Sequence, residues 1–283
     1  MPHIRINGAN LYYEEHGAGD TTIVFAHGLL WSGRMFSDQV AVLKDQYRCI
    51  TFDFRGQGQS QVPQSGYDIE SLYADAVKLI ELLGCSPCHY VGLSMGGFVG
   101  LRMAIRRPDL LRSLIIVGSS SDPEPTENIR RYRLLNLVAR WIGLGVVAER
   151  VMEIMFGHKF LNDPTRVALK HEWKERMAGN HRIGITRAVA GVINRAGVTE
   201  QLGQIGTPTL IIVGDQDLAT TPAKAKLMCA RIPNSRLVIV PGAGHTSTVE
   251  EPIAVTAAIQ EFLVNERDES CTVPRSVDRI NAR

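Results

Sequence analysis

Short apolar runs alternate along the chain with segments of helical period, and this alternation restricts the fold more than any other feature of the sequence. Seven runs rich in β-branched residues are typical of strands, at residues 10–15, 22–26, 48–52, 89–93, 111–117, 208–213 and 236–240. Helical spacing of apolar residues marks residues 69–83, 97–105, 223–232 and 252–264. Strands that are apolar on both faces are buried between layers of helices. The sequence therefore predicts an α/β fold, in which helices cover both faces of a mostly parallel sheet.

Residues 122–200 interrupt this alternation. They begin with a turn-forming Asp-Pro-Glu-Pro sequence and continue as successive helical patterns without a strand. We interpret this segment as a helical cap, inserted between a first core segment, residues 1–121, and a second one, residues 201–265. The remaining tail, residues 266–283, has few apolar residues and no periodicity, and we expect it to be mobile.

The charge of the cap allows two interpretations. The segment carries 13 Lys and Arg against 9 Asp and Glu, whereas the rest of the chain carries 18 against 20. The cationic excess favours a substrate with a carboxylate, but Arg130, Arg131 and Arg133 also suit a solvated helix face.

Bulky side chains near the expected site are candidates for a substrate pocket. They are Leu30, Trp31, Trp141, Met155 and Phe156. The aromatic and methionine side chains of the cap are equally suited to packing between its helices, so the sequence does not decide their role.

The overall composition excludes several classes of partner. The 283 residues carry a formal net charge of only +2, which gives no reason to expect nucleic acid or an anionic membrane as a partner. Because no segment approaches ~20 apolar residues and no apolar leader follows Met1, we expect a cytoplasmic protein. The five scattered cysteines are unlike a disulfide framework or a metal site, and we expect no metal and no cofactor. A monomer and a homodimer both remain open.

A serine between glycines follows the run at residues 89–93. Gly92-Leu93-Ser94-Met95-Gly96 matches G-x-S-x-G between an expected strand and an expected helix. Such an elbow holds the serine in a strained conformation, and glycines are needed two positions to either side because side chains there would collide. The turn presents the hydroxyl at the sheet edge, above a helix N-terminus that favours developing negative charge. Ser94 is therefore the candidate nucleophile.

A serine hydroxyl needs a base, and the base needs a carboxylate that orients it. His245 is the candidate base, since Pro241-Gly-Ala-Gly244 brings it to the same sheet edge as Ser94. Asp217 is the favoured carboxylate. Asp215 directly follows the glycine that ends its strand and suits the turn there, and Asp122 is a minor alternative at the start of the cap.

Acyl transfer also needs hydrogen-bond donors for the oxyanion of the tetrahedral intermediate. The backbone N–H of Met95 is the first candidate, because it directly follows the nucleophile. The second is the N–H of Leu29, in the loop His27-Gly28-Leu29-Leu30 after the run at residues 22–26. His27 itself is expected to orient this loop rather than to act as an acid or base.

Taken together, these motifs resemble the α/β-hydrolase superfamily over residues 1 to about 265. They are His27-Gly28, Asp53-Phe-Arg55-Gly56-Gln-Gly58-Gln-Ser60, Gly92-Leu-Ser94-Met-Gly96-Gly97, Gly214-Asp-Gln-Asp217 and Pro241-Gly-Ala-Gly-His245. Within the superfamily, the chain is most similar to 3-oxoadipate enol-lactonases, cofactor-free haloperoxidases and small carboxylesterases. The resemblance implies that Asp53 and Arg55 form a structural pair rather than a catalytic one. It also implies the chain order Ser94, Asp217, His245 for the triad.

We therefore predict a serine hydrolase that cleaves a carboxylic ester or lactone, a small molecule, through an acyl-enzyme on Ser94. Two alternatives use the same triad, namely perhydrolysis of the haloperoxidase type and hydrolysis of a carbon–carbon bond. An alternative of another class is a small-molecule receptor or signalling protein on a hydrolase fold.

Overall fold

The fold is built on a sheet of eight strands in the part of the chain that the computed structural model describes, residues 2–270. The strands are β1 (His3–Ile6), β2 (Ala9–His16), β3 (Thr22–Ala26), β4 (Arg48–Phe52), β5 (Cys88–Leu93), β6 (Leu111–Val117), β7 (Thr209–Gly214) and β8 (Ser235–Val240). Their order in the sheet is β1-β2-β4-β3-β5-β6-β7-β8. The strands from β3 to β8 are parallel, and β2 pairs antiparallel with both of its neighbours. The predicted α/β architecture is confirmed, and β1 is a strand that the sequence did not predict.

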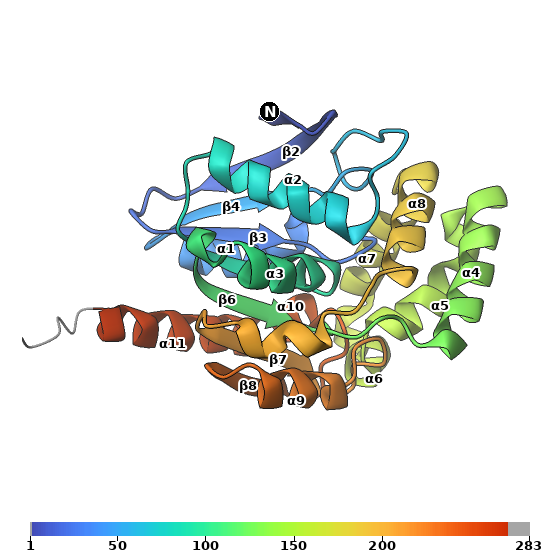
Figure 1. Cartoon of the computed structure of the whole chain (residues 1–283). Coiled ribbons are helices and arrows are strands. Elements are labelled where there is room, and N and C mark those ends of the chain that lie inside the picture. Colours follow the sequence, from blue (N-terminus) through green and yellow to red (C-terminus); the bar gives the residue numbers. More distant parts are fainter. Residues whose placement is uncertain (1, 271–283) are drawn as a thin grey trace, which may run out of the picture.

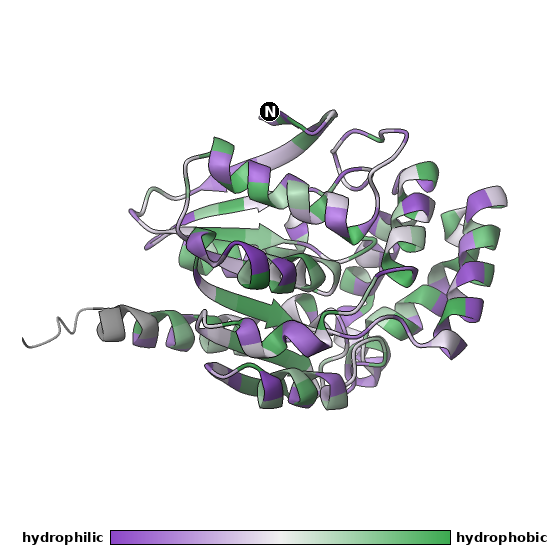
Figure 2. Ribbon diagram, viewed as in Figure 1, coloured by the Kyte–Doolittle hydropathy of each residue, from purple (hydrophilic) through white to green (hydrophobic). Residues whose placement is uncertain are grey.

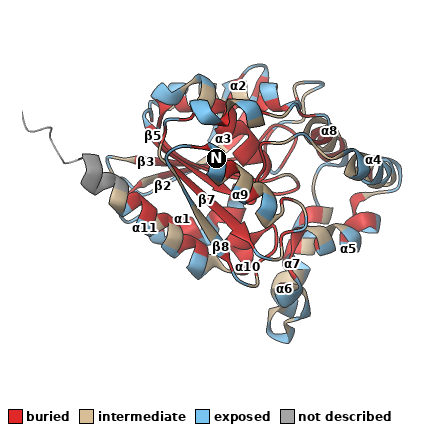
Figure 3. Ribbon diagram, turned by 60° about the horizontal axis from the view of Figure 1, so that its bottom comes forward, coloured by how far each residue is buried: buried red, intermediate tan, exposed pale blue. Residues whose placement is uncertain are grey.

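Helices cover both faces of this sheet (Figure 1). On one face lie α2 (Ile69–Leu82), α3 (Met95–Arg106) and α9 (Pro222–Arg231), and on the other lie α1 (Ser37–Leu43) and α11 (Pro252–Ser270). Successive residues of a strand point to opposite faces, so Val24 belongs to the core beneath α2 and α3, whereas Ile23 and Phe25 belong to the core beneath α1 and α11. This two-sided burial explains why the central strands β3, β5 and β7 are largely apolar (Figures 2 and 3).

Five further helices lie between β6 and β7, beyond the carboxyl ends of the parallel strands (Figure 1). They are α4 (Thr126–Trp141), α5 (Leu144–Met155), α6 (His158–Asn162), α7 (Val167–Ala178) and α8 (Arg182–Ile193). The segment predicted as a cap, residues 122–200, contains all five, and we call these helices the cap.

The C-terminal boundary differs from the expectation. Helix α11 continues to Ser270, so the predicted boundary at residue 265 falls within a helix. The rest of the expected tail, residues 271–283, lies outside the described residues. None of the helices within residues 2–270 combines the length and the apolar character needed to cross a membrane.

Candidate active site

Ser94 lies on a sharp turn between β5 and α3. Its φ of 51° and ψ of −108° lie in a region that non-glycine residues rarely occupy. A Cβ at Gly92 would lie 2.4 Å from the carbonyl oxygen of Gly96, and one at Gly96 would lie 2.0 Å from that of Ala26. Both positions therefore require glycine, which is the physical reason for the G-x-S-x-G spacing.

The turn is fixed to the neighbouring strand β6. The N–H of Ser94 donates to the carbonyl of Val117 at 2.9 Å, and the hydroxyl of Ser119 donates to the carbonyl of Ser94 at 2.8 Å. These two bonds hold the strained backbone while leaving the Ser94 hydroxyl at the edge of a cavity.

His245 and Asp217 meet at the carboxyl edge of the sheet. Nδ1 of His245 lies 2.9 Å from Oδ2 of Asp217 and 3.1 Å from Oδ1, and both residues are 2% exposed. The Asp217 carboxylate also accepts the backbone N–H groups of Ala219 and Thr220 and the Thr220 hydroxyl, each at 2.8 Å. A carboxylate held in this way favours the proton on Nδ1, so that Nε2 of the imidazole is the nitrogen able to accept a proton.

The two other candidate carboxylates have different partners. Oδ1 of Asp215 accepts the N–H of Gly242 at 2.7 Å and so joins the turns after β7 and β8. Oδ1 of Asp122 accepts the hydroxyl of Thr199 at 2.6 Å. Of the three acids considered, the structure brings Asp217 against His245.

Gly118 is a site residue that sequence reasoning missed. It follows β6 with a φ of +48°, and a Cβ there would lie 3.1 Å from the carbonyl oxygen of His245 and 3.2 Å from Oδ2 of Asp217. The backbone at the end of β6 therefore packs directly against the His245–Asp217 pair. No motif in the sequence marks this glycine.

The loop after β3 passes directly against the nucleophile. A Cβ at Gly28 would lie 2.8 Å from Cδ2 of Leu93 and 3.4 Å from Cβ of Ser94. The N–H groups of Leu29 and Met95 donate to no acceptor among the described residues, which leaves both available for an oxyanion.

Two buried side chains hold this loop in place. Nε2 of His27 accepts the N–H of Phe54 at 2.9 Å, while Nδ1 lies 2.7 Å from the carbonyl of Gly28. Burial lowers the pKa of His27, so the ring is neutral and orients the loop. The side-chain oxygen of Gln57 accepts the N–H of Leu30 at 2.9 Å. Gln57 was not predicted, although it lies within the Asp53–Ser60 motif.

The expectation that Asp53 and Arg55 form a pair with each other is wrong. Arg55 binds both oxygens of Asp75, on α2, at 2.6 Å. Asp53 instead accepts the N–H groups of Gly33 and Gln59, at 2.7 and 2.8 Å. The Arg55–Asp75 pair connects the loop after β4 to α2, and the spacing of the motif could not reveal a partner 20 residues away.

Glu250 is a buried acid directly behind the catalytic loop. It is 1% exposed, and its Oε2 accepts the N–H of Gly157 at 2.8 Å and that of Gly244 at 2.9 Å. Burial raises the pKa of Glu250 to about 7. One carboxyl group therefore joins the turn between α5 and α6 of the cap to the residue preceding His245.

A second connection lies beside it. The N–H and hydroxyl of Thr246 both donate to the carbonyl of Met155, at 2.9 and 2.8 Å. Three hydrogen bonds thus join residues 155–157 of the cap to Thr246 and Glu250, which follow His245 in the chain.

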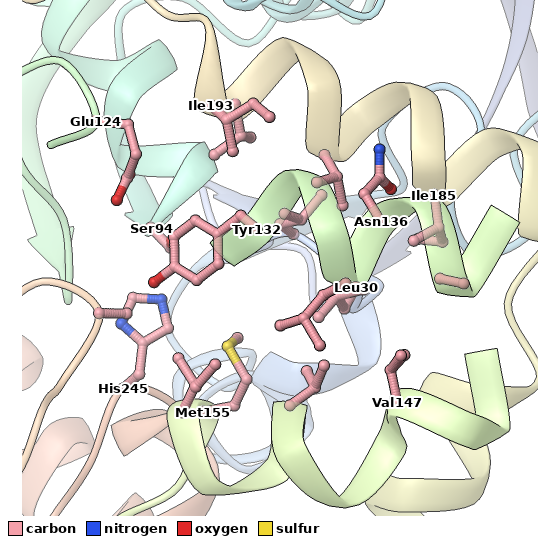
Figure 4. Close-up of a pocket in the computed structure, with 18 of the residues that line it drawn as sticks. Leu30, Ser94, Glu124, Tyr132, Asn136, Val147, Met155, Ile185, Ile193 and His245 are labelled. Atoms are coloured by element: carbon pink, nitrogen blue, oxygen red, sulfur yellow. The ribbon is translucent and has the colours of Figure 1, made fainter. Parts of the chain in front are cut away.

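A cavity opens from Ser94 and His245 into the cap (Figure 4). Two of the predicted pocket residues, Leu30 and Met155, line it. For Trp31, Phe156 and Trp141 the prediction is wrong. Trp31 packs edge-on against Trp173 and Phe156 in the core, with ring centroids 5.1 and 5.9 Å away. Trp141 is 74% exposed on α4. Apolar residues occupy both faces of that helix, so the sequence pattern did not show which face is buried.

The described residues provide no evident metal site. Within residues 2–270, no three His, Cys, Asp or Glu side chains are grouped so that they could hold a metal ion. Cys49, Cys85, Cys88 and Cys229 are free thiols.

A parallel sheet with covering helices, a strained serine after its central strand and a histidine–aspartate pair at the same edge together define a class of enzyme. The sequence pattern of the alpha/beta hydrolase fold matches residues 21–252. The chain belongs to the α/β-hydrolase family, and it is a hydrolytic enzyme.

Its relatives include members of each of the three groups that the sequence resembles, and also putative carbamate hydrolases such as that of a Caulobacter species, 30% identical over 90% of this chain and 96% of that protein. The chain is 28% identical over 256 residues to 3-oxoadipate enol-lactonase 2 of Acinetobacter baylyi, covering 89% of this chain and 92% of that protein. A thermophilic esterase from Thermogutta terrifontis superposes with a TM-score of 0.87 at 28% identity, over 94% of this chain and 99% of that one. A bromoperoxidase from Bacillus anthracis superposes with a TM-score of 0.82 at 25% identity, over 90% of this chain and 96% of that one. The resemblance is confirmed.

Proposed function

We propose that the protein hydrolyses a carboxylic ester or lactone through an acyl-enzyme on Ser94. The observation that carries this proposal is the 2.9 Å contact between Nδ1 of His245 and Asp217 at the edge of the cavity that Ser94 also lines. The same two classes of reaction appear in the names of the esterase and enol-lactonase relatives.

Each residue has a defined task in this mechanism. His245 Nε2 removes the proton of the Ser94 hydroxyl as its oxygen attacks the substrate carbonyl, and the N–H groups of Leu29 and Met95 stabilise the oxyanion. The imidazolium, stabilised by Asp217, then protonates the leaving oxygen. Water enters, loses its proton to His245, attacks the acyl-enzyme and releases the carboxylic acid with Ser94 restored.

Covalent labelling tests the nucleophile. We expect intact-mass spectrometry after treatment with a fluorophosphonate to show one adduct on the wild type and none on Ser94→Ala. We expect kcat for a simple ester to fall by about 10⁶-fold in that variant, because removing the nucleophile removes the work of the whole triad.

Ser37→Ala is the matched control, since Ser37 is exposed on α1 and should not affect labelling. An unlabelled, folded wild type would contradict the mechanism and favour the receptor alternative. Near-native hydrolysis by Ser94→Ala would contradict the role of Ser94 directly.

A further inference from the structure

The cavity beside Ser94 is bounded mainly by apolar side chains of three cap helices. Leu135 and Ala139 of α4, Val147 and Val151 of α5, and Ile185 and Val189 of α8 form its wall. It encloses about 140 Å³ and leads away from Ser94 and His245 toward Val147 and Ile185 (Figure 4). A substrate whose scissile carbonyl lies at Ser94 can therefore extend one arm into this space.

The positive charge at the cavity wall is already neutralised. Arg195 lies 2.9 Å from Oε2 of Glu124, and the two side chains are 2% and 7% exposed. The guanidinium group also lies 4.2 Å from the ring centroid of Phe98. Nε of Arg195 has no hydrogen-bond partner among the described residues, but a second carboxylate there would have to share the single positive charge with Glu124 and would leave a net negative charge in buried surroundings.

The other arginines of the cap that could have bound a carboxylate point elsewhere. Arg130, Arg131 and Arg133 are exposed, and none of them lines the cavity. Of the two interpretations of the cap's charge, the solvated helix face agrees with this placement.

We infer that the substrate carries an uncharged, apolar arm of several carbons that fills the cavity between α4, α5 and α8, and that carboxylate-bearing esters and lactones are rejected. This inference rests on the proposed function of Ser94. Burying one methylene group favours binding about fourfold, which corresponds to about 0.8 kcal/mol. An ionised carboxylate without a counter-ion of its own is strongly disfavoured in such surroundings.

The dependence of kcat/KM on the length of the substrate chain tests whether an apolar arm fills the cavity. We expect kcat/KM to rise roughly fourfold per methylene over the first few carbons, and then to reach a limit, in either p-nitrophenyl esters of lengthening acids or acetates of lengthening alcohols. A flat or falling profile in both series would overturn the inference.

Substitutions at Val147 test where the apolar arm of the substrate ends. Val147→Phe should move the optimum to shorter chains and Val147→Ala to longer ones, because Val147 lies at the end of the cavity remote from Ser94 (Figure 4). Val146→Phe is the matched control. Val146 precedes Val147 on α5 but is 65% exposed, so its substitution should leave the profile unchanged. Unchanged profiles in both Val147 variants would contradict this placement.

Glu124→Gln tests the charge argument, because it leaves Arg195 without its counter-ion. We expect the ratio of kcat/KM for a monoester of a dicarboxylic acid to that for the neutral ester of equal length to rise at least tenfold. This ratio does not depend on how much of the variant is folded. A wild type that prefers the carboxylate-bearing ester would overturn the inference.

Labelling separates the inference from the function on which it rests. A wild type that is labelled at Ser94 and cleaves esters without the predicted selectivity would refute the apolar arm alone. A folded wild type that is not labelled and cleaves no ester would refute the proposed function, and the inference with it.

Discussion

Gly118 shows how closely the backbone supports the His245–Asp217 pair. A Cβ built at this position would lie 3.1 Å from the His245 carbonyl oxygen and 3.2 Å from Oδ2 of Asp217. We expect Gly118→Ala to lower kcat by about 10–100-fold, because a small displacement of the imidazole disturbs proton transfer and because φ is +48°. Steady-state kinetics on the folded variant measures the effect.

Gly145→Ala is the control for this substitution. Gly145 lies within α5, and a Cβ there would meet nothing within 4 Å. We expect unchanged kcat and a gain of up to about 1 kcal/mol in the free energy of unfolding, since alanine is the better helix former. Equal kcat values for the two alanine variants would show that Gly118 does not support the pair.

Sequence reasoning reached the proposed catalytic residues more readily than the residues that hold them in place. Ser94, Asp217 and His245 each follow a strand in a recognisable motif, so their meeting at one sheet edge could be predicted. Gln57 and Glu250 act through contacts made only in three dimensions. Glu250 lies 93 residues from Gly157, whose N–H it accepts, and no spacing rule connects them.

Helix α4 illustrates the corresponding limit at the scale of an element. Its existence followed from composition and period, but apolar residues occur on both of its faces. Leu135 and Ala139 line the cavity, whereas Leu137 and Trp141 are 56% and 74% exposed. Periodicity defines the buried face of a helix only when the opposite face is polar, and so the sequence could not assign Trp141.

The edge strand β1 was missed for a related reason. His3–Ile6 is short, and Ile6 is its one buried residue. It is held by pairing with β2, which a local pattern cannot reveal. Most of the strands that were predicted, from β3 to β7, are buried along nearly their whole length, and there the apolar run itself is the signal.

Helices α3 and α4 differ in how many residues they bury, and this difference predicts how readily each helix opens locally. In α4, Ala139 is the one buried residue, whereas α3 buries ten residues, from Met95 to Ala104. We expect the amides of α4 to exchange with solvent at least about 100-fold faster than those of α3, since elements with few buried contacts open at lower free energy. Hydrogen exchange followed by mass spectrometry measures both helices in one sample. Equal protection would mean that the cap and the core open together.

The stability of the whole molecule is linked to pH through Glu250. Its pKa is raised to about 7 from an ordinary value of 4.5, chiefly by burial. A carboxyl group whose pKa is raised in the folded state stabilises the fold at low pH, and this contribution is lost as the pH rises through its folded pKa. Between pH 4.5 and pH 8 we expect the wild type to lose about 3 kcal/mol relative to Glu250→Gln.

Urea unfolding of the two proteins across this range measures the difference, and pH effects from all other groups cancel in it. Glu200→Gln is the control, because the Glu200 side chain is 89% exposed and its substitution should give no such slope. A constant difference between wild type and Glu250→Gln would show that Glu250 does not titrate in this window.

The position of the cap in the chain has an evolutionary consequence. β6 and β7 pair with each other, from Leu114 and Thr209 to Val117 and Ile212, so the polypeptide that leaves the sheet for the cap returns to the adjacent strand. Ser94, Asp217 and His245 all lie outside this excursion, so recombination within it can replace the cavity walls formed by α4, α5 and α8 without replacing these three residues. The turn at residues 155–157 is constrained, because Met155 accepts two hydrogen bonds from Thr246 and Gly157 donates one to Glu250. A lineage of such enzymes is therefore free to diversify the cavity walls, provided that this turn stays joined to the core.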